Sequence, residues 1–220
     1  MNKILSIIIP TYNAAQFLDK GLSTFIMEDK EMMDKLEVLI VNDGTKDNSV
    51  EVAQKFVDRY PNTFKIINKE NGGHGSAINT GVENVTGKYF KCVDADDWVY
   101  TDALERTMKI LEKEDFDALI QSFITYDISK DLWEPRDIHC DNTDRIYNLK
   151  EIVDMWEQID YGMSFHGVTY NSQFYKRLGY KLIEGVFYED QEYATIPLSY
   201  AKRIRLLDDE LYVYRLGDVN

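Results

Sequence analysis

Short apolar runs alternate with amphipathic segments along the first half of the chain. The runs are rich in β-branched and aromatic residues, which is typical of buried strands, and they lie at residues 4–9, 37–41, 64–67 and 89–93. Each is followed by a segment with apolar residues on one helical face, at 13–27, 48–59, 76–84 and 101–114. Asn13 and Thr101 stand where helix N-caps are expected. The alternation of strands and helices through short links predicts a parallel sheet with helices on both faces.

The second half of the chain is less regular. Strands are expected at 118–126, 145–149, 165–170, 204–207 and 211–214, and helices at 172–178 and at 189–200, with an interruption at Pro197. Asn148 and Glu151 have the spacing of a capping box and are expected to start a further helix that runs to about Gln158. Residues 127–143 are polar and irregular, so an exposed excursion is expected there. The predicted fold class is α/β, with a mostly parallel central sheet flanked by helices and a mixed α+β second half.

The composition limits the possible functions. The chain has 220 residues, of which 44% are hydrophobic, which suits a globular protein. Its formal net charge of −14 argues against nucleic acid as a partner, because that affinity comes from Lys and Arg on phosphates. The apolar runs are shorter than the ~20 residues of a membrane span, and the first strand begins too early for a signal peptide. Cys92 and Cys140 form no disulfide framework, although a bridge between them stays open, and a cytoplasmic location is expected.

The apolar run at 89–93 is followed directly by Asp94, Asp96 and Asp97. At the carboxyl end of a strand these carboxylates would enter the crevice where open α/β sheets bind ligands. Like charges this close repel each other, and a divalent cation relieves the repulsion. Oxygen ligands suit Mg²⁺ or Mn²⁺, which usually also hold substrate phosphates. The pattern favours a metal-dependent enzyme with a phosphorylated substrate, and a solvated turn is the alternative.

Three other polar or glycine-rich segments follow the preceding strands. With the acidic turn they form a set at residues 10–13, 42–44, 71–79 and 94–97. Loops after parallel strands emerge at one edge of the sheet, so all four are expected to meet. The glycine-rich segment lacks the third glycine of a dinucleotide-binding fingerprint and follows the third strand rather than the first. Each segment alone could be an ordinary turn, and the order of all four carries the prediction.

These segments resemble glycosyltransferases of family 2. The resemblance rests on Ser6-Ile-Ile-Ile-Pro-Thr-Tyr-Asn13, Val41-Asn-Asp-Gly-Thr-Lys-Asp47, Asn71-Gly-Gly-His-Gly-Ser-Ala-Ile-Asn79, Val93-Asp-Ala-Asp-Asp97 and Tyr188-Glu-Asp-Gln-Glu192. It covers residues 3–125 well and residues 165–215 more loosely. It implies a GT-A fold, a nucleotide-diphosphate-sugar donor, Mg²⁺ or Mn²⁺ as cofactor, and inversion of the anomeric centre.

Carried over by position, the resemblance also implies roles for single residues. The nucleotide site would comprise Pro10, Thr11, Tyr12, Asn13, Asp43, Gly73, His74 and Asp94. Asp96 and Asp94 would hold the metal, with Asp97 assisting, and Asp190 would be the general base. Arg215 matches a basic position that often closes over the diphosphate. Ile78 stands where many members carry Arg, so this helix lacks that cationic contact to the donor, for which His74, Lys69 or Lys88 could compensate.

The function expected is that of a metal-dependent, inverting hexosyltransferase. The donor would be a nucleotide-diphosphate sugar, first of all a UDP-sugar, and the acceptor a hydroxyl of a surface polysaccharide, a lipid-linked sugar or a protein-linked glycan. For inversion the base must lie on the face opposite the leaving group, so base and metal ligands should come from different parts of the chain. The alternatives are a nucleotidyltransferase, which would be expected to show a glycine-rich first loop, and a non-catalytic sugar-nucleotide or glycan-binding module.

The chain is expected to form one GT-A domain with two halves. Residues 1–125 would bind the nucleotide sugar, and residues 126–220 would form the acceptor side. Because the sequence stops just after a strand-like run, a domain cut from a longer protein is expected. The expected location is the cytoplasm, with peripheral association at the inner face of the membrane as the alternative, and the sequence assigns no oligomeric state.

Overall fold

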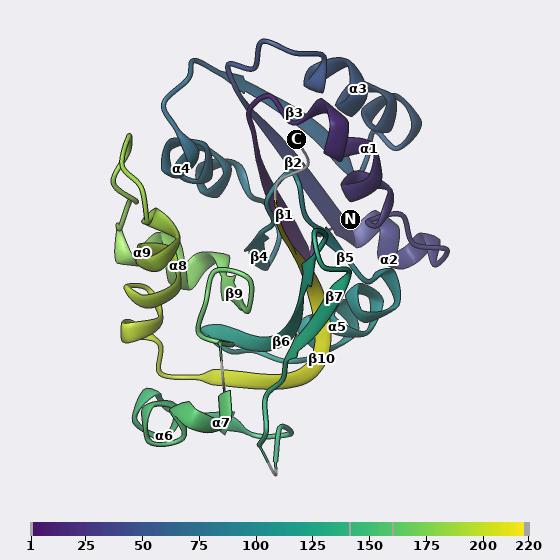
Figure 1. Ribbon diagram of the computed structural model, residues 1–220. Helices are drawn as coiled ribbons and strands as arrows, with labels where there is room; N and C mark the ends of the chain where they lie inside the picture. Colours follow the sequence, from purple (N-terminus) through teal and green to yellow (C-terminus); the bar gives the residue numbers. More distant parts are fainter. Residues whose placement is uncertain (1, 141, 160, 218–220) are drawn as a thin grey trace.

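The computed structural model describes residues 2–140, 142–159 and 161–217 (Figure 1). The expected cut at the chain end falls on residues 218–220, which lie outside the described residues. The strands are β1 (Leu5–Thr11), β2 (Leu36–Asp43), β3 (Phe64–Lys69), β4 (Tyr89–Cys92), β5 (Trp98–Val99), β6 (Ala118–Asp127), β7 (Leu132–Arg136), β8 (Ile146–Tyr147), β9 (Val168–Asn171) and β10 (Ile204–Leu216). The helices are α1 (Ala15–Ser23), α2 (Lys30–Lys35), α3 (Ser49–Arg59), α4 (His74–Asn84), α5 (Thr101–Lys113), α6 (Leu149–Asp154), α7 (Trp156–Ile159), α8 (Ser172–Leu178) and α9 (Glu189–Thr195), with a 3₁₀ turn at Leu198–Tyr200.

The strands join into a single sheet in the order β3-β2-β1-β4-β9-β6-β10-β5, and β7 and β8 pair at its margins. Neighbours among the first four strands are parallel, as the alternating pattern predicts. β9 is antiparallel to both β4 and β6, and β10 is parallel to β6. The predicted fold class is therefore confirmed, because a mostly parallel sheet continues into a mixed second half.

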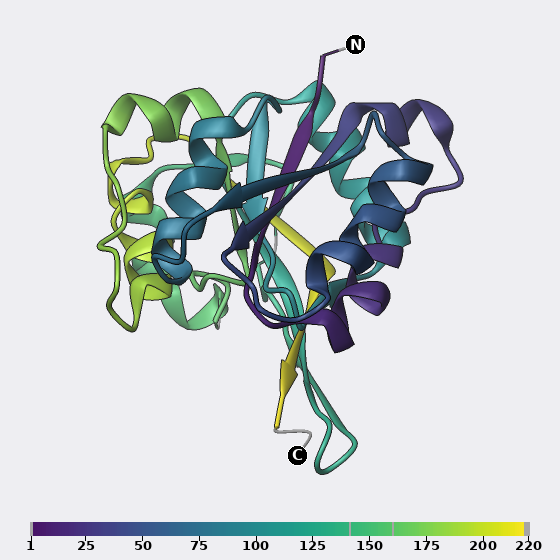
Figure 2. The ribbon, with the colours of Figure 1, turned by 90° about the horizontal axis from the view of Figure 1, so that it is seen from above.

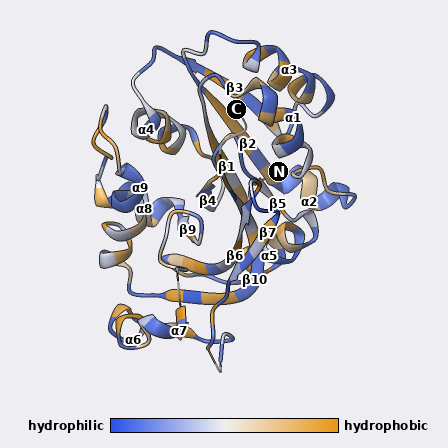
Figure 3. Ribbon diagram, viewed as in Figure 1, coloured by the Kyte–Doolittle hydropathy of each residue, from blue (hydrophilic) through white to orange (hydrophobic). Residues whose placement is uncertain are grey.

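Helices cover both faces of the sheet, and each face has its own hydrophobic core. Along β1, Ile7 and Ile9 pack into the core beneath α1, α2, α3 and α5, whereas Ile8 packs into the core beneath α4, α6, α7, α8 and α9. Because successive side chains of a strand point to opposite faces, an unbroken apolar run serves both cores. Figure 2 shows the two helix layers on either side of the strands. Figure 3 shows hydrophobic colouring along the central strands.

The second half differs from the sequence-based expectations in several places. The predicted strands at 204–207 and 211–214 are one strand, β10, whose pairing with β6 shifts register between Leu207 and Tyr212. Within the predicted excursion, residues 132–136 form β7, antiparallel to β6, because Trp133 stacks on Tyr126 with ring centroids 4.1 Å apart. The strand expected at 165–170 begins only at Val168.

Besides β7, two short elements were not expected from the sequence, and two helix N-termini are capped differently from the expectation. The sequence pattern missed the short α2 and the two-residue β5. α1 starts at Ala15, and its backbone N–H is capped by Asp47 rather than by Asn13. Thr101 is the first residue of α5, and its hydroxyl donates to the Thr24 carbonyl instead of capping the helix. The capping box of Asn148 and Glu151 is confirmed.

Candidate active site

The loops after β1, β2, β3 and β4 meet at one edge of the sheet around a cleft of about 790 Å³. That volume lies within the range of about 300–1,000 Å³ usual for small-molecule sites. The residues predicted for the nucleotide all line it, namely Pro10, Thr11, Tyr12, Asn13, Asp43, Gly73, His74 and Asp94, and so does Asp96 of the predicted metal pair. The structure therefore brings these residues together.

The first wall of the cleft is the turn after β1. Asn13 adopts a left-handed backbone conformation with φ of 50°, which Asn tolerates better than most residues. Its side-chain oxygen accepts hydrogen bonds from the Lys46 backbone N–H and the Thr45 hydroxyl. These bonds hold the turn open, so that the Tyr12 side chain is presented to the cleft and left half-exposed.

Asp43, at the end of β2, organises the glycine-rich turn. Its Oδ1 accepts hydrogen bonds from Lys69 Nζ at 2.6 Å and from the Gly72 N–H at 2.9 Å, and its Oδ2 accepts one from the Gly73 N–H at 2.8 Å. Asp43 is almost fully buried, yet it reaches the floor of the cleft. A carboxylate has about four lone-pair sites, so Oδ2 retains capacity for a ligand N–H.

The acidic turn after β4 holds three carboxylates in different surroundings. Asp97 is buried and accepts hydrogen bonds from the Tyr212 hydroxyl and the Arg215 backbone N–H. Asp96 is more exposed, and its Oδ2 lies 3.3 Å from Arg215 Nη1. Burial and the charge of Asp94 raise the pKa of both Asp96 and Asp97. The turn therefore brings three carboxyl groups so close together that their charged forms oppose one another, as the sequence predicts.

His74, at the start of α4, connects two carboxylates across the cleft. Its Nε2 lies 2.8 Å from Asp94 Oδ1, and its Nδ1 lies 2.8 Å from Glu189 Oε1. Burial disfavours the charged imidazole, but Asp94 and Glu189 outweigh it and raise the pKa of His74 to about 9. Although burial opposes it, the same contact lowers the pKa of Asp94. At neutral pH His74 is therefore a cation that donates to both neighbours.

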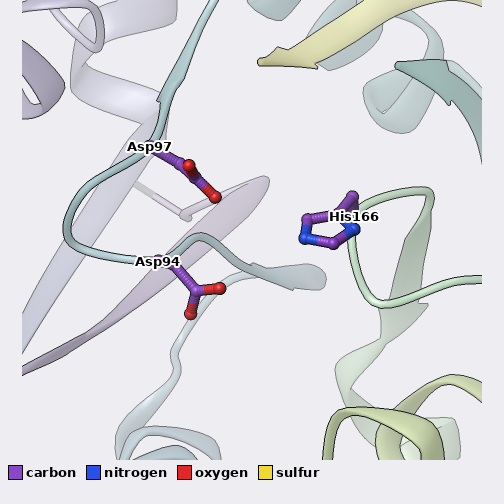
Figure 4. A group of neighbouring side chains, drawn as sticks. All are labelled: Asp94, Asp97 and His166. Atoms are coloured by element: carbon purple, nitrogen blue, oxygen red, sulfur yellow. The ribbon is translucent and has the colours of Figure 1, made fainter. Parts of the chain in front are cut away.

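His166, from the second half of the chain, lies close to the acidic turn. Figure 4 shows Asp94 and Asp97 on one side and His166 facing them from a separate loop. The His166 ring stacks on Tyr214 at 3.9 Å between centroids. Burial lowers the pKa of His166 to about 4, so the ring is neutral at ordinary pH, and the charge of Asp190 acts on both His166 and Tyr214. Asp190 lies in the first turn of α9 and is not among the residues that line the cleft.

The donor set fits a divalent cation. One ligand atom each from Asp94, Asp97 and His166 lies within 4.8 Å of the other two. Carboxylate oxygens with an imidazole nitrogen suit Mn²⁺ and are compatible with Mg²⁺. Asp96 is not part of this group, although it lines the cleft and neighbours Asp94, so its metal role stays a prediction.

The basic residues predicted to contact the donor lie in different surroundings. Arg215 pairs with Asp96 and packs 4.6 Å over the Phe17 ring, beside the main cleft. Lys69 is paired with Asp43, and Ile78 is fully buried in the core. Lys88 donates to the Leu111 and Glu114 carbonyls, so the expectation that it could supply charge at the cleft is wrong.

Sequence reasoning did not identify two partners of the acidic turn. Tyr212 contacts it from β10, and Glu189 contacts it through His74. No local motif marks Tyr212, because its role depends on a pairing between distant segments. Glu189 is next to Asp190, the predicted base, yet only the structure shows that Glu189 contacts His74.

The fold and the cleft define an α/β protein with a carboxylate-lined ligand site at the carboxyl ends of parallel strands. The model of the family described as Glycosyl transferase family 2 matches residues 6–179, and the chain belongs to that family. An uncharacterized glycosyltransferase of Escherichia coli, YibD, is 30% identical over 98% of this chain, and Bacillus subtilis EpsJ, also described as an uncharacterized glycosyltransferase, is 26% identical over 98%. The chain spans 62% of the length of each.

Two solved structures share the fold. Staphylococcus aureus TarS, solved with UDP-GlcNAc, superimposes with a TM-score of 0.77 at 20% identity and covers 99% of this chain and 60% of its own. The mannosyltransferase PcManGT of Pyrobaculum calidifontis, solved with GDP-Man and Mn²⁺, gives a TM-score of 0.69 at 19% identity and covers 100% of this chain and 59% of its own. These similarities confirm a GT-A-like fold. Among the described residues, no helix combines the length and the apolar character needed to cross a membrane.

Proposed function

We propose that this chain binds a nucleotide-diphosphate sugar, first of all a UDP-sugar, and transfers the sugar with inversion to a hydroxyl of a glycan, lipid-linked or protein-linked acceptor. The carrying observation is that Asp94 lines the cleft with the residues predicted for the nucleotide and also lies close to His166. The charge of Asp190, from the first turn of α9, acts on the same His166 ring. An inverting sugar transfer needs a charge-stabilising group at the diphosphate and a base on the opposite side of the sugar, so residues from separate elements that approach one site support the proposal.

The donor assignment draws on the cleft and on the structural relatives. The cleft offers Tyr12 as a stacking face and Asp43 as a hydrogen-bond acceptor for a base N–H. TarS has been solved with UDP and with UDP-GlcNAc, whereas PcManGT has been solved with GDP-Man. A nucleoside diphosphate is common to these ligands. Uracil is the base proposed here because its ring N–H can donate to Asp43.

The residues of the acidic turn would hold Mn²⁺ or Mg²⁺ against the diphosphate. When bound, the cation would stabilise the negative charge that develops on the leaving phosphate oxygen. Its protein ligands would come from Asp94 and Asp96, with Asp97 and His166 close to the same position. Arg215 beside Asp96 and the cationic His74 beside Asp94 would add fixed positive charge near the donor.

Asp190 would take the proton from the acceptor hydroxyl. A hydroxyl is a poor nucleophile, and a positioned carboxylate base contributes about 10²–10⁴-fold to such a step. Asp190 is half-buried in the first turn of α9, and its charge acts on His166 and Tyr214. Inversion would require the base and the metal ligands to lie on different sides of the sugar, and their origin in separate elements of the fold supports this.

Calorimetric titration of UDP and GDP tests the donor and the metal assignments. UDP should bind at least about tenfold more tightly with Mn²⁺ than with EDTA, which corresponds to about 1.4 kcal/mol. Asp96→Ala should remove most of that difference. Asp115→Ala provides the control, because Asp115 is an exposed carboxylate that pairs with Lys88 away from the cleft. Equal affinity in both buffers would contradict the metal assignment, and tighter binding of GDP would contradict uracil.

The retained alternative is a non-catalytic sugar-nucleotide-binding module. Such a module would bind the nucleotide in the same cleft but would not need Asp190. Screening a panel of nucleotide sugars for Mn²⁺-dependent release of the nucleotide separates the two functions, because a binding module gives thermal stabilisation without turnover.

A further inference from the structure

The glycine-rich turn and α4 contact the segment that leads into α9. Both ring nitrogens of His74 are used in this region, with Nδ1 2.8 Å from Glu189 Oε1 and Nε2 2.8 Å from Asp94 Oδ1. The side chains of His74 and Glu189 are 34% and 10% exposed, so water competes little for the bond on the Glu189 side. One imidazole therefore ties the first turn of α9 to the end of β4.

The glycines of this turn allow a close approach that larger residues would prevent. A Cβ atom on Gly75 would lie 2.9 Å from the Ile183 carbonyl oxygen and 3.3 Å from Glu189 Cγ. At Gly73 the constraint is the backbone, because its φ of 88° is a conformation that side chains rarely adopt, and a Cβ atom there would be in ordinary van der Waals contact with Gly185 at 3.7 Å. Glycine permits such contacts between backbones. The surface that the turn presents here is therefore shaped to fit residues 183–189.

Asn79 makes the third connection, one turn further along α4. Its Nδ2 donates to the Leu182 carbonyl at 2.9 Å, and its Oδ1 accepts from the Leu182 N–H at 2.9 Å. The same Nδ2 lies 3.1 Å from Glu184 Oε1. Asn79 is 8% exposed, so these bonds are made in a largely dry environment. A side-chain amide that satisfies both backbone groups of one residue fixes that residue in position and orientation.

The segment between α8 and α9 has few apolar anchors of its own. Ile183, Val186, Phe187 and Tyr188 are all exposed, and Phe187 is 92% exposed. Figure 3 shows hydrophobic colouring on this projecting loop. The Ile183 N–H donates to Glu192, which connects the loop to its own helix rather than to the sheet. The contacts with α4 therefore largely determine the position of the loop and of the start of α9.

We propose that His74, Gly75 and Asn79 are positioning residues that hold residues 182–190 against α4 and thereby aim Asp190 at the acceptor. This inference rests on the proposed role of Asp190 as base. It assigns the glycine-rich turn a second role beside any contact with the donor. We call these three residues the clamp. A displacement of about 1 Å in a catalytic group can cost about 10²-fold in rate, so the clamp should affect turnover more than donor binding.

Hydrogen–deuterium exchange tests the clamp without requiring any catalysis. In Asn79→Ala and His74→Phe, the backbone amides of residues 183–190 should exchange at least about tenfold faster, because local opening costs less free energy. Exchange in β1 and β2 should stay as in the wild type. Glu83→Ala is the matched control, because it removes an exposed ion pair between α4 and Lys181 and should leave the segment unchanged. Wild-type exchange in both variants would overturn the proposal.

Turnover separates positioning from binding. Glu189→Ala removes the contact of α9 with His74 but leaves the contact between His74 and Asp94. UDP affinity should therefore be unchanged, while turnover of the sugar nucleotide falls about 10-fold to 10²-fold. Glu189→Gln keeps an oxygen acceptor for His74 and should restore most of the rate. Full turnover in Glu189→Ala would contradict the clamp. Full turnover in Asp190→Asn would instead contradict the base assignment, while the exchange result would still stand.

Discussion

The Tyr212 hydroxyl donates a hydrogen bond of 2.5 Å to Asp97 Oδ2 and accepts one of 3.0 Å from the Asp94 backbone N–H. Tyr212 is fully buried on β10. A single phenol therefore holds both ends of the acidic turn, and it reaches the turn from a strand near the other end of the sequence. The geometry of the carboxylates that face the cleft depends on this contact.

Replacing Tyr212 by Phe should destabilise the protein and weaken metal-dependent binding. The variant leaves the buried Asp97 without one hydrogen-bond donor, and an unsatisfied buried group costs about 1–3 kcal/mol. Urea unfolding measures the loss, and calorimetry with UDP and Mn²⁺ measures the effect on the cleft. Tyr214→Phe is the control, because it keeps the ring that stacks on His166. Equal losses in the two variants would contradict the special role of Tyr212.

Asp47 should make a pH-dependent contribution to stability. Although slight desolvation opposes it, hydrogen bonds from Ser49, the Ala15 N–H and Thr45 lower the pKa of Asp47 from its ordinary value of 3.8 to about 2. Because the folded pKa lies below the unfolded one, the contribution is fully present above pH ~4 and is lost as the pH falls toward ~2. Asp47→Asn should therefore lower the free energy of unfolding by about 1 kcal/mol or less at pH 7, since the group is exposed.

Urea unfolding at several pH values between 7 and about 2.5 checks this dependence. The difference between wild type and Asp47→Asn should shrink as the pH falls. Asp58→Asn is the comparison, because Asp58 accepts a hydrogen bond from Gln54 on the surface of α3 and caps no helix. A difference that stays constant over the whole range would show that charge on Asp47 is not the cause.

Phe187 should matter for ligands and not for folding. Its side chain is 92% exposed, yet it lines the cleft from the loop before α9. Phe187→Ala should therefore leave the free energy of unfolding within about 0.5 kcal/mol of the wild type, as is usual for surface substitutions. It should raise the KM for the sugar nucleotide or the acceptor. Unchanged kinetic constants would show that the loop contributes no contact to the substrates.

The sequence predicts the first half of the fold well because each strand and helix there carries its own local signal. The buried run of β1 and the carboxylates that follow β4 are both local patterns, and the parallel order of the strands then brings their loops together. The second half depends on pairings between distant residues. The stacking of Trp133 on Tyr126 turns an irregular polar segment into β7, and no periodicity signals it.

The site divides in the same way. Most of the residues that line the cleft belong to four local motifs, whereas the positions of Tyr212 and His166 and the bond between His74 and Glu189 depend on how distant segments pack. Asn13 has a side chain that commonly caps helices, so the sequence predicts a cap at this position. In the structure its side-chain oxygen instead accepts hydrogen bonds from Thr45 and Lys46 and so holds the turn after β1. Side chains with several possible partners cannot be assigned from the sequence alone.

The most direct test is the release of UDP from the preferred UDP-sugar by wild type and Asp190→Asn, measured in Mn²⁺ together with UDP affinity. We expect Asp190→Asn to bind UDP as the wild type does and to lose about 10²-fold or more in turnover, because it keeps the shape of the side chain and loses its basicity. Turnover at the wild-type rate in Asp190→Asn would contradict the proposed active site.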